Sequence, residues 1–425
     1  MSALAETKAD CLAGDRLARR NALVLAATQA LAGGNNTVLV ATAGIVGTML
    51  APDKGLATLP ISIFVLGLWM GTLPMGALAR RLGRRSAMQI GTACGVLTGL
   101  LCCIAVLHGS FLLFNIGAVF SGFYAAAHQS YRFAAADTAS EAFRAKAIGW
   151  VLFGGVVAGI VGPQLVIATQ NLWPPYLFAA TYMGQSVLAL ISAGVLMLVS
   201  IPKPPPRSVA GDGRPLSEIA RQPRFVVAVA CGVASFSMMN LVMTSAPLAM
   251  VMCNHSVTDA TLGLQWHVLG MYAPSFVTGA LISRIGLERI IGLGLALIIV
   301  AAVIGVAGIS LWHFWIGLAL LGVGWNFAFI GATTMVTTCH RPNERNKVQA
   351  FNDFLVFGSM AIGSFSSGAL LVSFGWSMVN EVVFPVVLAA GVLLIWGARA
   401  VSGGGRNGRA AECALDRWSG APVLR

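Results

Sequence analysis

The sequence predicts an all-α membrane protein in which twelve transmembrane helices form two six-helix bundles in a pseudo-twofold arrangement. Three observations support this fold class: a very apolar composition, a motif that recurs at half the chain length, and a one-sided distribution of basic residues. Of the 425 residues, 57% are hydrophobic and only 10% are charged, whereas about a quarter are charged in soluble domains. So few charges cannot cover a water-exposed surface, so we expect the chain to lie in lipid.

The recurring motif begins at Gly76 with the sequence Gly-Ala-Leu-Ala-Arg-Arg-Leu-Gly-Arg-Arg, and a second copy begins at Gly279. The positions that are identical in the two copies are Gly76/Gly279, Ala77/Ala280, Leu78/Leu281, Arg81/Arg284 and Gly83/Gly286. A repeat at half the chain length indicates two copies of one structural unit. In a chain this apolar, it is typical of a transporter with two membrane halves.

A transmembrane helix needs roughly 20 apolar residues, and twelve runs meet this requirement. They are 21–49, 57–79, 87–108, 111–136, 147–169, 176–201, 225–251, 261–283, 290–309, 312–338, 349–374 and 379–401. The polar, proline-rich stretch between the sixth and seventh runs has the composition of a linker. The predicted domains are therefore an N-terminal tail (1–20), a first bundle (21–201), a linker (202–224), a second bundle (225–401) and a C-terminal tail (402–425).

The basic residues predict which loops face the cytoplasm. If the N-terminus is inside, Lys54 is the only basic residue in an outside loop, Arg132 lies at the end of the fourth run, and the other 25 of the 27 basic residues lie on the inside. Cytoplasmic loops collect lysine and arginine in this way, so we expect a multi-pass protein of the bacterial inner membrane with both termini in the cytoplasm. Because the membrane explains where the net charge of +12 lies, we exclude nucleic acid as a partner.

The motif at Gly76 resembles the signature of the loop between spans two and three of the major facilitator superfamily, Gly-x-Leu-Ala-Asp-Arg-x-Gly-Arg-Arg. The resemblance extends over residues 20–400, because six spans, a linker and six further spans are that superfamily's architecture. The departure is Arg80, which stands where the family usually has aspartate.

The resemblance implies a cytoplasmic latch, in which arginines of this loop pair with acids of a neighbouring helix and hold the inward face closed. Glycines let helix ends approach closely, and arginines offer forked donors. The predicted latch residues are Gly76, Arg81, Gly83, Arg84, Arg85, Asp137, Glu141 and Arg284. The alternative is that these arginines only follow the cytoplasmic bias of basic residues.

Three further stretches resemble one branch of bacterial superfamily members, and the riboflavin uptake carriers of Gram-negative bacteria are one group consistent with them. They are Tyr131–Asp137, Gly270–Phe276 and Gly324–Phe327. The fifth run matches the antiporter motif of the superfamily only in part, at Gly149, Gly162 and Pro163. Import and export therefore both remain open at this point.

The resemblance implies a substrate site between the halves, lined mainly by the first, fourth, seventh and tenth spans. Polar side chains are costly in a bilayer and usually face protein or water, so those within cavity-lining spans are candidates. The predicted substrate-binding residues are Gln29, Asn36, Tyr124, His128, Asn240, Trp266, His267, Trp325 and Asn326. For each of them, the alternative is an ordinary contact between helices.

Three titratable groups are candidates for proton coupling: His128, His267 and Asp353. Asp353 is the carboxylate placed most clearly within a span, and burial makes a carboxyl a plausible proton carrier. The alternative for Asp353 is a structural ion pair with Arg345 or Lys347, about two helical turns away.

These observations predict a secondary active transporter that moves a small organic solute across the inner membrane by alternating access, with proton coupling. The specific expectation is uptake of a planar vitamin such as riboflavin. The alternatives are a multidrug or metabolite efflux antiporter and a non-transporting membrane scaffold of the same fold. We expect a monomer with neither cofactor nor metal and no enzymatic activity, because no nucleotide-binding loop, catalytic constellation or metal-ligand spacing is present in the sequence.

Overall fold

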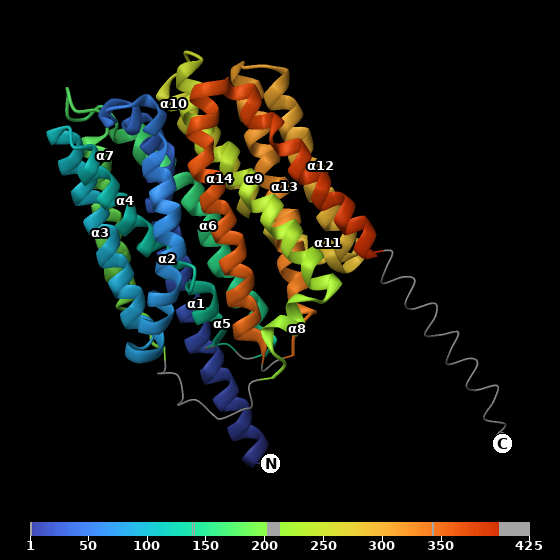
Figure 1. Cartoon of the computed structure of the whole chain (residues 1–425). Helices are drawn as coiled ribbons and strands as arrows, with labels where there is room; N and C mark the ends of the chain where they lie inside the picture. The colour runs from blue at the N-terminus through green and yellow to red at the C-terminus, as the bar shows by residue number, and fades with distance from the viewer. Residues whose placement is uncertain (1, 138, 140, 202–212, 342–343, 399–425) are drawn as a thin grey trace.

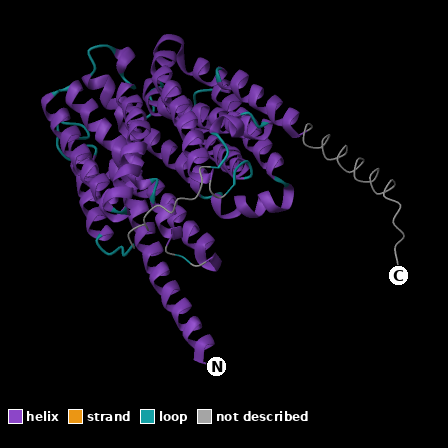
Figure 2. Ribbon diagram, turned by 60° about the horizontal axis from the view of Figure 1, so that its bottom comes forward, coloured by secondary structure: helices purple, strands orange, loops and turns teal. Residues whose placement is uncertain are grey.

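The structure is a computed structural model that describes residues 2–137, 139, 141–201, 213–341 and 344–398. Within these residues the regular secondary structure is helical and no strand occurs (Figure 2). The helices are α1 (Ser2–Leu50), η1 (Lys54–Leu56), α2 (Leu59–Leu82), α3 (Arg84–His108), α4 (Phe111–His128), α5 (Tyr131–Asp137), α6 (Glu141–Thr169), α7 (Ala179–Leu196), α8 (Leu216–Ala220), α9 (Pro223–Met252), α10 (Val257–Tyr272), α11 (Ser275–Ile285), α12 (Leu287–Ala307), α13 (Leu311–Thr337) and α14 (Arg345–Glu381). A further helical stretch covers 383–398.

The helices form two bundles that lie side by side (Figure 1). In the first bundle, α1 packs on α6, while α4 packs on α2 and α3, and α3 also packs on α7. In the second bundle, α13 packs on α10 and α12, and α9 packs on α14. The bundles meet where α2 contacts α14, α6 contacts α10 and α1 contacts α9. The predicted arrangement of two bundles is therefore confirmed.

The number of spans also agrees with the prediction. Ten helices in the described part of the chain are long and apolar enough to cross a bilayer, and the bent pair α10–α11 supplies an eleventh span. The last of the ten covers 52 residues, from Lys347 to Ala398. At 1.5 Å per residue it would be about 78 Å long, more than twice the hydrocarbon core. Gly375, with φ 81°, interrupts it, and the two parts run in opposite directions (Figure 1), which gives the twelfth span.

The two copies of the motif form the same turn. Gly83 separates α2 from α3 with φ 90° and ψ 155°, and Gly286 separates α11 from α12 with φ 97° and ψ 150°. A side chain disfavours positive φ, whereas glycine adopts it readily. The structure thus confirms that the repeated sequence builds one repeated turn.

Two predicted runs are not single helices. The fourth run divides into α4 and α5 at Gln129–Ser130, and the eighth divides into α10 and α11, which are inclined at 43° to each other. The second break lies at Pro274, which has no backbone N–H and therefore cannot continue the hydrogen-bond ladder. The expectation of one continuous helix over 261–283 was therefore wrong.

The bundles are tied together at the end that lies away from the arginine-rich turns. The Ser62 and Ser364 hydroxyls lie 3.2 Å apart and join α2 to α14. Gln170 donates from Nε2 to the Thr258 hydroxyl at 3.1 Å, between the end of α6 and the start of α10. These contacts close this end of the interface between the halves.

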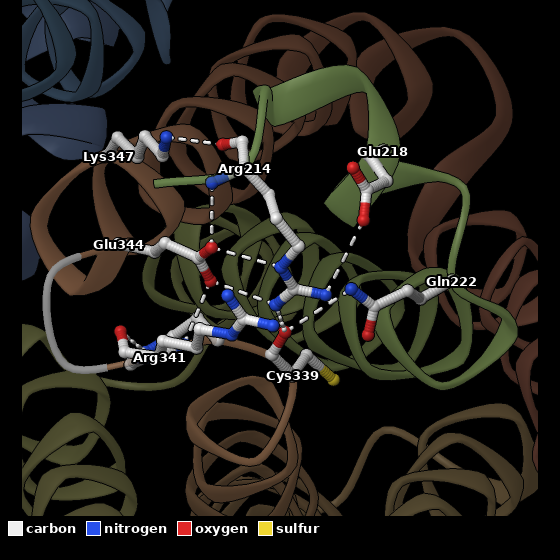
Figure 3. A network of polar contacts seen from close by, with 8 residues as sticks. Arg214, Glu218, Gln222, Cys339, Arg341, Glu344 and Lys347 are labelled. Carbon is white, nitrogen blue, oxygen red and sulfur yellow. Dashed lines mark hydrogen bonds and ion pairs between the residues drawn. The ribbon is translucent and has the colours of Figure 1, made fainter. Parts of the chain in front are cut away.

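At the opposite end, the chain before α9 is fastened to the turn before α14 (Figure 3). The Glu344 carboxylate, which is 0% exposed, accepts from Arg214 Nε at 2.9 Å and Nη2 at 2.8 Å. It also accepts from the backbone N–H groups of Arg214 and Arg341, both at 2.9 Å. Lys347 donates to the Arg214 carbonyl. We call this group of Arg214, Arg341, Glu344 and Lys347 the linker clasp.

The linker clasp shifts the protonation of Glu344. Hydrogen bonds from the Arg214 guanidinium, together with the backbone donors, hold the pKa of the Glu344 carboxyl well below its ordinary value. Hydrogen bonds between ionised groups are stronger than neutral ones. The carboxylate therefore stays charged and bonded throughout the neutral range.

Candidate functional site

A cavity lies between the two bundles. Its lining residues come from α1, α2, α4, α6, α9 and α10, and Gln129 directly after α4 adds to them. They are Gln29, Gly33, Asn36, Thr37, Val40, Phe64, Leu68, Ala125, His128, Gln129, Gly155, Ala158, Met243, Leu264, Val268, Met271 and Tyr272.

The first bundle supplies most of the polar side chains of this cavity. Gln29, Asn36 and Thr37 lie on one face of α1, because residues seven and eight apart lie on the same side of a helix. His128 ends α4 and Gln129 follows it. We call these five residues the polar wall.

The second bundle supplies mainly apolar side chains. Met243 comes from α9, and Leu264, Val268 and Met271 come from one face of α10. We call these four residues the apolar wall. Tyr272, next to Met271, is the polar exception on this side. The cavity is therefore amphipathic, with its polar groups gathered on one bundle.

Asn36 and His128 are joined across the cavity wall. The Asn36 amide nitrogen lies 2.6 Å from His128 Nε2. The remaining polar atom of each side chain, Asn36 Oδ1 and His128 Nδ1, is buried without a protein hydrogen-bond partner. Buried polar atoms are rarely left unpaired in folded proteins. A ligand that lies against this pair can supply the missing partners.

The packing around His128 fixes its ring. Tyr124 and Tyr131 flank it with ring centroids at 6.4 and 6.1 Å, and the Tyr124 hydroxyl donates to Ser192 on α7 at 3.1 Å. On the opposite side, Gly155 on α6 lets the Tyr272 ring approach, because a Cβ there would lie 2.9 Å from that ring. The shape of the cavity is thus set by fully packed neighbours.

A second hollow, with an empty volume of about 740 Å³, lies between α2 and α14. Trp69, Phe354 and Phe357 form its aromatic lining, and Asp353 is its carboxylate. Asp353 accepts from the Asn352 amide at 3.2 Å. Arg132 of the first bundle lies within electrostatic range of this carboxylate.

Sequence and structure comparisons agree on what this arrangement is. The sequence profile of the Major Facilitator Superfamily matches residues 25–271 and 254–421. The chain belongs to the Major Facilitator Superfamily. It is 49% identical over 380 residues to the riboflavin transporter RfnT of Brucella anthropi, which covers 89% of this chain and 96% of that protein. It is 28% identical over 386 residues to the uncharacterized transporter YddS of Bacillus subtilis, which covers 81% of this chain and 86% of that protein.

Solved structures of the superfamily share the fold. The xylose transporter XylE of E. coli superposes with a TM-score of 0.68 at 12% identity, covering 89% of this chain and 97% of that one. A D-xylose–proton symporter gives the same TM-score at 14% identity, covering 89% and 96%. The superfamily predicted from the motif at Gly76 is confirmed, and the chain is a multi-pass membrane transporter rather than an enzyme.

Three of the predicted substrate-binding residues line the central cavity: Gln29, Asn36 and His128. Tyr124 lies behind His128 and is 0% exposed. Asn240 is buried and donates to the Met360 carbonyl at 3.4 Å, which joins α9 to α14. The structure therefore gives Tyr124 and Asn240 supporting positions, and we leave both out of the proposed site.

The other four predicted binding residues also lie away from the cavity. Nδ1 of His267 is 2.8 Å from the Leu318 carbonyl, so it donates to α13 from a fully buried position. Trp266 is 45% exposed on the bundle surface. Trp325 stacks on Phe329 at 5.1 Å within the second bundle.

Asn326, the last of these residues, forms hydrogen bonds at the break between α10 and α11. Its amide donates to the Met271 carbonyl at 2.6 Å and to the Ser275 hydroxyl at 2.7 Å, while Thr278 donates to its Oδ1 at 2.6 Å. Pro274 cannot continue the helical ladder past this point, so Asn326 supplies polar partners at the break. We assign Asn326 a structural role.

The predicted latch is only partly described by the structure. The side chains of Asp137 and Glu141 lie outside the described residues. Arg85 donates to the Met197 carbonyl at 2.8 Å and so holds α3 against the end of α7. Glu344, which follows Glu141 by the offset of the repeated motif, bonds to Arg214 of the linker clasp. The latch itself remains a prediction.

The sequence-based search missed the apolar wall. It considered polar residues in the expected spans, and it therefore passed over Met243, Leu264, Val268 and Met271. The spacing of the residues from α10 was a usable signal, because positions 264, 268, 271 and 272 lie on one helical face. Gln129 and Thr37 were visible as polar residues within spans but were not included in the predicted site.

Proposed function

We propose that this transporter takes up riboflavin across the bacterial inner membrane by alternating access. The observation that carries the proposal is the identity of 49%, over nearly the full length of both chains, with a protein named as a riboflavin transporter. The amphipathic cavity between the bundles supports it, because a planar heterocycle needs a few placed polar groups within an otherwise apolar pocket. In this proposal the substrate binds among Gln29, Asn36 and His128.

The proposed orientation places both termini and the linker clasp in the cytoplasm. The bias of lysine and arginine supports it, and we keep the boundaries at 21–201 and 225–401 for the two rocking units. The contacts at Ser62–Ser364 and Gln170–Thr258 then close the outer face. These bonds must break when the site opens outward, because both join one bundle to the other. A monomer contains the whole cavity and is the proposed working unit.

Uptake of labelled riboflavin by cells that cannot synthesise it tests this function. We expect gene-dependent uptake, and we expect Asn36→Ala and His128→Ala to lower it about fivefold or more, because each removes a buried hydrogen-bonding group worth 1–3 kcal/mol. His108→Ala, at the exposed end of α3, is the matched control and should transport normally. Surface expression is measured for every variant. Cells that express the protein yet show no gene-dependent uptake would refute the proposed substrate.

Proton coupling is the second part of the proposal, with Asp353 as the proton carrier and His128 as the titratable group in the cavity. Asp353 is chosen because it lies in a hollow between the halves, where its charge acts on that of Arg132. A group in this position can exchange its proton as the halves move. His267 is left out because it lines neither of the two hollows.

Asp353→Asn is expected to separate concentrative uptake from exchange. The amide keeps the shape of the side chain but carries no titratable proton, so accumulation against a gradient should be lost. Exchange of internal for external riboflavin in loaded vesicles should persist. The protonophore sensitivity of the wild type should be absent from whatever transport remains. Full accumulation by Asp353→Asn would show that this carboxylate does not carry the coupled proton.

A further inference from the structure

We infer that the central cavity binds a planar heterocycle in one orientation, with its imide edge against Asn36 and His128 and its hydrocarbon edge against the apolar wall. An imide edge is an N–H flanked by two carbonyl groups. The inference rests on the proposed function and deepens it, because riboflavin carries such an edge at one end of its ring system and a dimethylbenzene edge at the other.

The first step is the hydrogen-bonding pattern left by the Asn36–His128 contact. If the Asn36 amide donates to Nε2, a neutral His128 carries its proton on Nδ1, so the free atoms are an acceptor (Asn36 Oδ1) and a donor (His128 Nδ1). If the amide is flipped, Asn36 keeps a free donor and His128 Nδ1 becomes an acceptor. Both assignments leave at least one donor and one acceptor. An imide edge satisfies either arrangement, because its N–H lies between two carbonyl oxygens.

The second step excludes other ligand edges. An alkyl or ether edge would leave a buried donor, a buried acceptor or both unpaired, which costs affinity. A carboxylate or phosphate offers only acceptors, so the acceptor of the pair would stay unpaired. Neither lysine nor arginine is among the described residues that line this cavity, so an anion would also lack a counter-charge there. The imide edge pairs both atoms without adding charge.

The third step is the opposite side of the cavity. Met243 and Met271 present thioether side chains beside Leu264 and Val268. Methionine sulfur makes favourable contacts with aromatic rings and adapts its shape to them. If the ligand were reversed, its carbonyl groups would face this apolar wall and lose their hydrogen bonds to water without replacement. Because the polar groups of the lining lie mainly on the first bundle, this cost selects the orientation.

Binding of flavin analogues to the purified full-length protein tests the orientation. Quenching of flavin fluorescence gives the dissociation constants of riboflavin, 3-methylriboflavin, which lacks the imide N–H, and 7,8-didemethylriboflavin, which lacks the two ring methyl groups. For the wild type, we expect 3-methylriboflavin to bind at least about tenfold more weakly than riboflavin, because a site built to pair an N–H rejects an analogue without it. We expect a weaker loss, about threefold to tenfold, for the didemethyl analogue.

Two variants assign each edge to its wall. In Asn36→Ala, the preference for riboflavin over 3-methylriboflavin should fall to less than about threefold, because the hydrogen-bonding pair is gone. The preference over the didemethyl analogue should persist. In Met243→Ala, the preference over the didemethyl analogue should fall, whereas the preference over 3-methylriboflavin should persist. Met252→Ala, at the exposed end of the same helix α9, is the matched control and should keep both preferences. Thermal melting curves confirm that each variant is folded.

The outcomes separate the orientation from the proposed substrate. Equal affinity of the wild type for riboflavin and 3-methylriboflavin would overturn the orientation and leave riboflavin as the substrate. The orientation would also be overturned if Met243→Ala abolished the preference for riboflavin over 3-methylriboflavin while Asn36→Ala kept it. Failure of the folded wild type to bind or take up any flavin would instead overturn the proposed function, and the inference would fall with it.

Discussion

Gly122→Val is expected to prevent the first bundle from assembling. A Cβ at Gly122 would lie 2.5 Å from the Leu68 nitrogen and 2.6 Å from the Gly67 carbonyl carbon. These are backbone atoms, which cannot move aside as a flexible side chain can. Small residues allow this close crossing of α4 and α2, and in a bilayer such packing is a main source of helix association. We expect a loss of at least about 3 kcal/mol, seen as aggregation on size-exclusion chromatography and a lower Tm.

Gly194→Val is the matched control for this change. Gly194 lies in the last turn of α7, and a Cβ there would contact nothing within 4 Å. The control protein should therefore elute as a single species with the Tm of the wild type. If Gly122→Val behaved in the same way, α2 and α4 would not be in the close contact described above.

Glu344→Gln is expected to open the linker clasp. The amide cannot accept the charge-assisted bonds that Arg214 now donates through Nε and Nη2. Hydrogen–deuterium exchange of residues 213–222 should therefore become several-fold faster. Arg214→Gln should have the same effect, and the double variant should be no worse than either single one, because both lose one shared interaction. Arg221→Gln, an exposed neighbour, should leave the exchange unchanged.

The pH dependence of the linker clasp follows from the lowered pKa of Glu344. A carboxyl with a depressed pKa in the folded state stabilises that state fully above its unfolded pKa, and the stabilisation is lost as the pH falls toward the folded value. After correction for the intrinsic exchange rate, protection should stay constant from pH 8 to the ordinary carboxyl pKa of about 4.5. Below that value it should decline. Protection that already falls between pH 7 and pH 6 would assign the effect to another group.

The architecture followed from the sequence because two strong signals acted together. Hydropathy marked the spans, and the repeat of the motif predicted that Gly83 and Gly286 occupy the same turn, which their torsion angles confirm. The helix breaks at Gln129 and Pro274 were not foreseen, since a run of apolar residues looks the same whether its helix is straight or bent. Pro274 was the available signal for the second break.

The site was less predictable because a polar residue within a span has two equally good physical uses. Asn36 and Asn326 are both asparagines within apolar spans, yet Asn36 lines a cavity while Asn326 bonds to a carbonyl beside a proline break. Hydropathy does not distinguish a side chain that can bind a ligand from one that forms a hydrogen bond to the backbone of a neighbouring helix. That distinction depends on the rotation of each helix and on the proximity of the next one. The apolar wall is harder still to find, since methionine and leucine are ordinary residues in such helices.

The linker clasp also changes how far the two bundles can separate. The segment that joins them is fastened to the second bundle at Arg214, well before α9 begins at Pro223. Thirteen residue steps lie between Ile201 and Arg214, which reach at most about 45 Å when fully extended. While the clasp holds, these residues alone form the tether across the opening between the bundles at this end. The length of this tether then sets an upper limit on the width of that opening. Each further residue released by an open clasp would raise the limit by about 3.5 Å.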